Sequence, residues 1–203
     1  MFGLKKRSLA LPPSPSPLEI HLVRHGEAYD ESGVDTHGPE LTPMGLQQAR
    51  QLAKRLSNNH YSAIYCSDLT RARQTADAIT HHHADALLTV TRDLREVSGD
   101  HSTLIRSRLT VHSDRSMIEE QDAMHRVINH IREIHSQPEC ILIVSHGNIM
   151  RSLIPMLGGL EPSNAPLLEI YNTALCIVDC WPTNRAVLRL ANCVSHLNER
   201  LIS

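Results

Sequence analysis

Three short segments of the sequence place arginine or histidine directly after an apolar run. They are residues 24–26 (Arg-His-Gly), residues 67–71 (Ser-Asp-Leu-Thr-Arg) and residues 145–147 (Ser-His-Gly). An arginine offers paired donors that match phosphate oxygens, and a neutral histidine can attack phosphorus and carry the phosphoryl group covalently. The glycine after His25 lets the backbone come close to a ligand. If the fold brings these segments together, they can form a site for a phosphate ester.

Such chemistry also needs a carboxyl group, because the leaving oxygen must receive a proton. Glu96 follows the apolar run at residues 87–90, and it could protonate that oxygen and later take a proton from water. Ordinary structural roles are the alternative for each residue. Arg24 and Arg71 could be surface charges, and Glu96 could cap a helix or form an ion pair.

The elements that position these residues alternate along the chain. Short apolar runs predict strands over residues 20–23, 61–66, 87–90, 140–144, 174–178 and 186–190. Helical spacing predicts a helix from Pro43, capped by Thr42, a helix capped by Ser67 or Asp68, and further helices from about Ile118 and after Gly147. The alternation predicts an α/β fold: one domain with a mainly parallel sheet and helices on both faces. The carboxyl ends of parallel strands lie at one edge, where ligands bind.

Length and composition limit the classes of protein that the chain can belong to. Its 203 residues suit one domain: residues 1–17 are basic and rich in proline and predict a flexible tail, and residues 18–203 form the folded domain. The net charge of −2 does not indicate the basic surface that binds nucleic acid. No apolar stretch has the length of a membrane span. The five cysteines are an odd number without a C-x-x-C pair, so we expect a reducing, cytoplasmic location.

Fourteen histidines raise the question of a metal site. Residues 81–83 are three consecutive histidines, which point in different directions on a helix and therefore chelate poorly. We interpret them as cationic side chains at the carboxyl end of a helix. The sequence contains no H-E-x-x-H motif, so we expect neither a metal nor another cofactor.

Five pieces of the sequence, in order, resemble the histidine phosphatase superfamily, which includes the phosphoglycerate mutases. Residues 22–27 resemble its L-x-R-H-G-E signature, and residues 41–49 are similar to its L-T-x-x-G-x-x-Q-A helix. Residues 67–76 resemble its S-x-L-x-R-A-x-Q-T-A segment, residues 94–96 its acid motif and residues 144–147 its second histidine motif. Residues 172–173 (Asn-Thr) resemble a later family element. The resemblance implies a phosphoglycerate mutase-like fold.

The resemblance also implies a role for each matching residue. His25 would accept the phosphoryl group, and Glu96 would be the proton donor. Arg24, Arg71 and His146 would hold the phosphoryl oxygens, without a metal. Gly147 stands where the acid phosphatase and phytase branch has aspartate, which indicates the branch whose acid follows a strand.

The chain departs from the mutases after the acid motif. Residues 97–100 (Val-Ser-Gly-Asp) replace an arginine and an aromatic-glycine pair, and the segment before the helix at Ile118 is short. A mutase must keep water from its phosphohistidine, so an open pocket favours hydrolysis. We therefore expect a phosphatase that acts on a phosphorylated small molecule or a phosphoprotein. The alternatives are mutase-type phosphoryl transfer, a weakly catalytic protein that binds a phosphorylated ligand, and an adaptor that works through its proline-rich tail.

Overall fold

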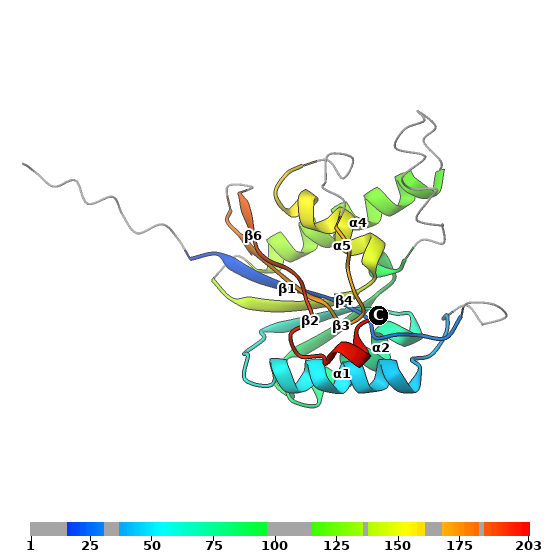
Figure 1. Cartoon of the computed structure of the whole chain (residues 1–203). Helices are drawn as coiled ribbons and strands as arrows, with labels where there is room; N and C mark the ends of the chain where they lie inside the picture. Colours follow the sequence, from blue (N-terminus) through cyan, green and yellow to red (C-terminus); the bar gives the residue numbers. More distant parts are fainter. Residues whose placement is uncertain (1–15, 31–36, 97–114, 136–137, 161–167, 183–184) are drawn as a thin grey trace, which may run out of the picture.

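The computed structural model describes residues 16–30, 37–96, 115–135, 138–160, 168–182 and 185–203. It contains one six-stranded sheet with helices on both faces (Figure 1). The strands are β1 (Leu18–Arg24), β2 (Ala63–Ser67), β3 (Leu87–Thr91), β4 (Cys140–Ser145), β5 (Leu175–Cys180) and β6 (Ala186–Cys193). The helices are α1 (Pro43–Leu56), α2 (Thr70–Thr80), α4 (Arg115–Ile134) and α5 (Gly147–Leu157), with short 3₁₀ turns η1 (Arg92–Leu94) and η3 (Glu199–Leu201).

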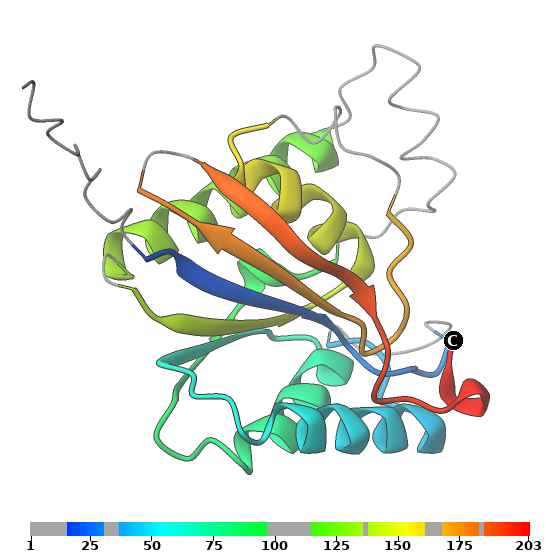
Figure 2. The same ribbon diagram turned by 60° about the vertical axis from the view of Figure 1, so that its left-hand side comes forward.

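The strands lie in the order β3-β2-β4-β1-β5-β6. The first four of these are parallel to one another, which confirms the prediction of a mainly parallel sheet. The last two are different, because β5 is antiparallel to β1 and β6 is antiparallel to β5. Figure 2 shows this antiparallel pair, in orange, beside the blue ribbon of β1. Apolar periodicity alone did not distinguish the two orientations.

The sheet separates two apolar cores (Figure 1). One core lies under α4 and α5 and includes Ile141 and Ile143 of β4. The other lies under α1 and α2 and includes Leu142 and Val144 of the same strand. All four side chains are fully buried, because successive residues of a strand point to opposite faces and helices cover both. This central strand is therefore rigidly held up to its carboxyl end.

The predicted start of α1 is confirmed. Thr42 is the N-cap, and its hydroxyl accepts a hydrogen bond of 3.0 Å from the amide of Gly45. Pro43 occupies the first helical position, where its missing amide hydrogen is not needed. Residues in the last turn include Lys54 and Arg55, whose charges suit the carboxyl end of a helix.

The predicted cap of α2 is wrong. The N-cap is Leu69, which makes no side-chain capping bond. Asp68 instead forms an ion pair with Arg95, through bonds of 2.5 and 2.9 Å. The hydroxyl of Ser67 lies 2.9 Å from His146. Both side chains are thus used by residues that are distant in sequence, and these long-range contacts replace a local cap.

Other predicted boundaries shift by a few residues. β2 begins at Ala63 rather than at residue 61, α4 begins at Arg115, and the last two strands extend to Cys180 and Cys193. The histidines at 81–83 follow α2, which ends at Thr80. Burial lowers the pKa of His83, and its ring packs edge-on against Tyr61 at 4.9 Å between centroids, so the interpretation of this residue as a cation is wrong.

Two predictions lie mostly outside the described residues. They concern the tail over residues 1–17 and the irregular segment after Glu96, of which residues 1–15 and 97–114 are not described. The first strand begins at Leu18.

All five cysteines are free thiols. None of the helices in the described part of the chain is long and apolar enough to cross a membrane.

Candidate active site

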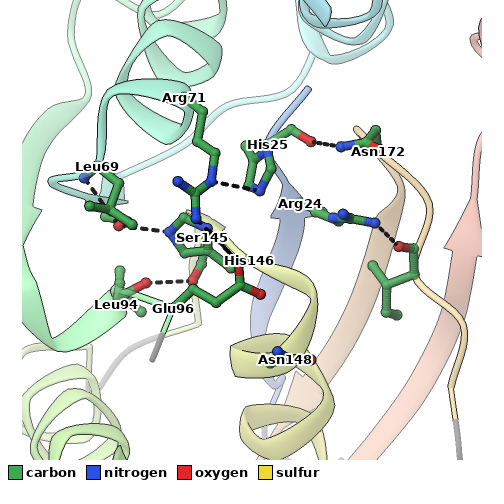
Figure 3. A network of polar contacts seen from close by, with 12 residues as sticks. Arg24, His25, Leu69, Arg71, Leu94, Glu96, Ser145, His146, Asn148 and Asn172 are labelled. Atoms are coloured by element: carbon green, nitrogen blue, oxygen red, sulfur yellow. Dashed lines mark hydrogen bonds and ion pairs between the residues drawn. The ribbon is translucent and has the colours of Figure 1, made fainter. Parts of the chain in front are cut away.

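The parallel register of β1 and β4 brings the two predicted histidines together. Arg24, the last residue of β1, pairs with Ser145, the last residue of β4. The next residue of each strand is therefore a histidine at the same edge, and the rings of His25 and His146 lie 5.0 Å apart between centroids (Figure 3). The amide of His25 also donates to the carbonyl of Ser145 at 3.0 Å. The sheet, rather than a flexible loop, sets the spacing of these two rings.

His25 is oriented so that one ring nitrogen keeps a free electron pair. Its Nδ1 lies 2.7 Å from the carbonyl oxygen of Gly26. A carbonyl can only accept, so Nδ1 must carry the proton and Nε2 must not. Burial, together with the nearby charges of Arg24 and Arg71, holds the pKa of His25 well below its ordinary value. The ring is therefore neutral, and Nε2 is a candidate nucleophile.

Arg71 contacts His25 Nε2 directly. It lies in the first turn of α2, and its Nε donates to His25 Nε2 at 3.1 Å. Its Nη2 lies 3.2 Å from Glu96 Oε2 (Figure 3). Arg71 is only 3% exposed, whereas Arg73 is exposed on the other side of the helix. Arg71 therefore faces the cluster and Arg73 faces solvent.

His146 is fully buried and is held by a hydroxyl group. Its Nε2 lies 2.9 Å from Ser67 Oγ, and this oxygen accepts a bond of 3.3 Å from the amide of Leu69, so the hydroxyl hydrogen is available to His146 Nε2. Its Nδ1 lies 3.7 Å from Glu96 Oε2. Burial and the neighbouring His25 and arginines hold the pKa of His146 well below its ordinary value, so this ring is neutral too.

Two buried donors at this edge have no hydrogen-bond partner among the residues that the structure describes. They are Nε of Arg24 and, in the tautomer in which Ser67 donates to Nε2, Nδ1 of His146. Arg24 is itself anchored, because its Nη1 donates to the carbonyl of Ile170 at 2.7 Å. An unsatisfied buried donor costs about 1 to 3 kcal/mol, so native proteins rarely leave one without a ligand or water. An anion with several acceptor oxygens would satisfy both groups.

Glu96 reaches the cluster from the segment after β3. The hydroxyl of Ser145 donates to the carbonyl of Leu94 at 2.8 Å, which ties this segment to the end of β4. The side chain of Glu96 is 26% exposed, while its Oε2 contacts both Arg71 and His146. Its carboxyl group is thus placed between the buried cluster and solvent, where a leaving group would depart.

Gly26 does not serve the close approach of a ligand that we expected from the sequence. A Cβ atom on Gly26 would lie 2.6 Å from the carbonyl oxygen of Gly45, and one on Gly45 would lie 1.9 Å from the carbonyl oxygen of Glu27. The missing side chains therefore allow two backbone segments to touch, rather than a ligand to approach. The amide of Glu27 also donates to Gln48 at 2.7 Å. These contacts fix the turn after His25 against α1.

Residues 172–173 support His25 from the other side, a role that the sequence did not reveal. Asn172 Nδ2 donates to the carbonyl of His25 at 3.1 Å, and the amide of Thr173 lies 3.2 Å from the same oxygen. Thr173 has φ of 57°, in the left-handed region, where a β-branched residue is strained by about 1 to 3 kcal/mol. Strain of this kind is retained where the surroundings over-determine it, and no residue pattern could show it.

His196 and Thr75 are further supports that the sequence analysis missed. His196 Nε2 lies 3.1 Å from the hydroxyl of Thr173, and burial, with the charge of Arg55, lowers the pKa of His196 to about 4. The hydroxyl of Thr75 accepts a bond of 3.0 Å from the amide of Gly26. Thr75 belongs to the motif over residues 67–76 and could have been singled out there. His196 lies outside every motif.

The three residues His25, Glu96 and His146 could also be considered as metal ligands, since their ligand atoms lie within 4.8 Å of one another. The surrounding charge favours an anion instead. Arg71 places a guanidinium 3.1 Å from His25 Nε2, and Arg24 acts on both histidines from close by. A cation here would face two fixed positive charges.

Comparison with known proteins agrees with this geometry. The chain is 30% identical to phosphoglycerate mutase-like protein 4 of Arabidopsis thaliana, over 89% of this chain and 87% of the relative. It is 26% identical to the mitochondrial serine/threonine-protein phosphatase Pgam5 of Caenorhabditis elegans, over 91% of this chain and 66% of the relative. Its fold is similar, with a TM-score of 0.69 and 23% identity, to phosphoserine phosphatase from Entamoeba histolytica solved with 3-phosphoglyceric acid, over 89% of this chain and all of that one.

The decisive comparison is the match to a whole family. Residues 20–193 match the family model of branch 1 of the histidine phosphatase superfamily. This range includes His25, His146, Glu96 and helix α2 with Arg71, and it contains most of the six-stranded sheet. The chain therefore belongs to branch 1 of the histidine phosphatase superfamily.

Proposed function

We propose that the chain is a phosphatase that hydrolyses a phosphomonoester through a phosphohistidine intermediate on His25, with Glu96 as general acid and base. One observation carries the proposal. The unprotonated Nε2 of His25, which accepts a hydrogen bond from Arg71, lies among buried donors, two of which have no partner in the described part of the chain. A nucleophile surrounded by anion-binding donors is suited to attack a phosphate ester.

In the first step, His25 Nε2 attacks phosphorus and the bond from phosphorus to the ester oxygen breaks. Glu96, in its protonated form, gives its proton to that oxygen, so the leaving group departs as an alcohol. Arg24, Arg71 and His146 bind the phosphoryl oxygens and stabilise the charge that is spread over them in the transition state. The proton stays on His25 Nδ1, hydrogen-bonded to the Gly26 carbonyl, throughout this step.

In the second step, the carboxylate of Glu96 takes a proton from water as the water oxygen attacks phosphorus. The bond from phosphorus to His25 Nε2 breaks, inorganic phosphate is released and the neutral imidazole is restored. Glu96 is protonated again and is ready for the next ester. The arginines supply positive charge in both steps, and we propose that the reaction needs no metal.

Hydrolysis is preferred to mutase-type transfer because residues 97–100 lack the arginine and aromatic-glycine pair of the mutases. The second candidate is still phosphoglycerate mutase-type transfer, since a relative with 30% identity is named mutase-like. The names of similar proteins also suggest two substrate classes. A phosphorylated small molecule is suggested by the phosphoserine phosphatase, and a phosphoprotein by the serine/threonine-protein phosphatase.

The test is phosphate release by the purified chain from phosphoserine, 3-phosphoglycerate, an aryl phosphate and a phosphopeptide. We expect hydrolysis by the wild type, loss of activity in His25→Ala and retention in His60→Ala, which changes an exposed histidine. Equal release by His25→Ala would refute the proposal. Conversion of 3-phosphoglycerate to its isomer faster than hydrolysis would favour the mutase. Binding of the esters without turnover would favour a ligand-binding protein.

A further inference from the structure

A second cluster of side chains that could bind a metal ion lies at the beginnings of β1 and β4. The candidate active site lies at the other ends of these strands. Glu19 and His21 are two residues apart on β1, so they point to the same face. Cys140 opens β4 and pairs with Glu19 in the parallel register. The cluster precedes His25 by four to six residues, about 13 to 20 Å along an extended strand. It is therefore separate from the candidate active site.

The three side chains converge on one point. Glu19 Oε1 lies 2.6 Å from His21 Nε2 and 3.7 Å from Cys140 Sγ. The three ligand atoms all lie within 4.8 Å of one another. His21 is 3% exposed, whereas the side chain of Glu19 is 33% exposed. The cluster thus has a rigid buried ligand and a side that is open to an ion from solvent.

We propose that Glu19, His21 and Cys140 form a site for a zinc-type divalent cation, with water as the fourth ligand. A carboxylate, an imidazole and a thiolate are the ligand types that zinc uses. Zinc bonds of about 2.0 to 2.3 Å in a tetrahedron place ligand atoms about 3.3 to 3.6 Å apart. The distance of 3.7 Å from Glu19 to Cys140 is close to this range, and rotation of the partly exposed Glu19 side chain would lengthen its distance of 2.6 Å to His21.

Neighbouring groups hold the ligands in place. The hydroxyl of Tyr61 lies 2.7 Å from His21 Nδ1 and accepts a bond of 3.0 Å from Asn59. This contact leaves His21 Nε2 directed at the cluster. The second carboxylate oxygen of Glu19 is bound by Arg189 of β6, so Oε1 is the oxygen that faces the other ligands. Such outer contacts orient metal ligands and tune their affinity.

The charges of the cluster balance when an ion is bound. Arg189 also lies 3.1 Å from Asp179 of β5. The carboxylates of Glu19 and Asp179 and the guanidinium of Arg189 give a net charge of −1. The Cys140 thiol and the His21 imidazole are counted as neutral. Binding of a divalent cation, with the Cys140 proton lost to solvent, adds +2 and −1 and makes the group neutral. The bound ion would join the beginnings of β1 and β4.

Titration of the metal-free full chain with Co²⁺ and with Zn²⁺ tests the proposal. Tetrahedral cobalt bound to a thiolate gives an intense charge-transfer absorption in the near ultraviolet, which a site of nitrogen and oxygen ligands does not give. We expect this band to saturate at one equivalent in the wild type, to disappear in Cys140→Ser and to remain in Cys193→Ser. Glu19→Gln, at a partly exposed position, should weaken binding at least about tenfold and retain the band.

A thermal measurement gives a second readout that does not depend on activity. Zinc at 100 times its dissociation constant should raise Tm by about 5 to 10 °C, and Cys140→Ser should remove this rise. Absence of the cobalt band in wild type, or its persistence in Cys140→Ser, would overturn the proposal. Cobalt absorption without the thiolate band would place the ion on nitrogen and oxygen ligands rather than on Cys140, and would also overturn the proposal. Circular dichroism checks that each variant is folded.

Discussion

Removal of Arg71 should damage turnover far more than removal of Arg73, although the two residues are chemically identical neighbours. Arg71 directs Nε at His25 Nε2 and Nη2 at Glu96, at 3.1 and 3.2 Å, so two donors face the position of the transferring phosphoryl group. Hydrogen bonds to charged groups contribute about 1.5 to 3 kcal/mol each. Two such bonds give at least about 3 kcal/mol, so Arg71→Ala should lower kcat/KM by about 100-fold or more.

The matched control is Arg73→Ala, which changes an exposed residue on the same helix. It should keep kcat/KM within about threefold of wild type and change the free energy of unfolding by no more than about 0.5 kcal/mol. Arg71→Lys should also be impaired, because lysine cannot supply two donors in a fixed plane. The assay is kcat/KM of all variants on one aryl phosphate. A loss at Arg73 equal to that at Arg71 would refute the reasoning.

Three further predictions concern the general acid Glu96, the absence of a metal requirement and the half-buried His196. Glu96→Gln should slow an alkyl phosphate by roughly 100- to 10,000-fold and an activated aryl phosphate much less, because a good leaving group needs no proton. Extensive chelation should leave phosphatase activity unchanged. Acidification from pH 7 to 5 should lower the urea midpoint, and less so in His196→Gln. The pKa of His196 is about 4 in the folded chain and about 6.5 when unfolded, so the unfolded state takes up protons first.

Each of these predictions has a clear contrary result. Equal losses on both esters would show that Glu96 is not the general acid. Activity that is lost on chelation and restored by one divalent ion in Cys140→Ser, as well as in wild type, would mean that His25 and His146 act with a metal. An identical fall of the urea midpoint in wild type and His196→Gln would show that His196 does not contribute to the pH dependence.

The sequence predicted the fold where local chemistry decides the outcome. The Thr42-Pro43 pair marks the start of α1 because both residues act on their own helix turn. The apolar run at residues 140–144 identifies the central strand because both of its faces are buried. The orientation of β5 and β6 depends instead on pairing between strands, which apolar periodicity does not specify.

The same distinction holds at the candidate site. Residues in ordered motifs could be named because each follows a strand at the same sheet edge, as His25 and His146 do. The sequence did not show the roles of residues that act through distant backbone, even where, as at Thr173, the residue lies in a motif. Thr173 supports the carbonyl of His25 only because of its left-handed backbone, and His196 reaches Thr173 from beyond β6. Ser67 was assigned to a helix cap, since its contact with His146 joins residues 79 positions apart.

The central claim is the covalent intermediate on His25, and rapid-quench labelling tests it most directly. Wild-type protein is mixed with an ester that carries a radiolabelled phosphoryl group, and the reaction is stopped within the first turnover. We predict label on the protein that is labile in acid and stable in base, located on His25 and absent from His25→Ala, with His60→Ala labelled like wild type. Turnover without labelled protein, or label that survives in His25→Ala, would contradict the account.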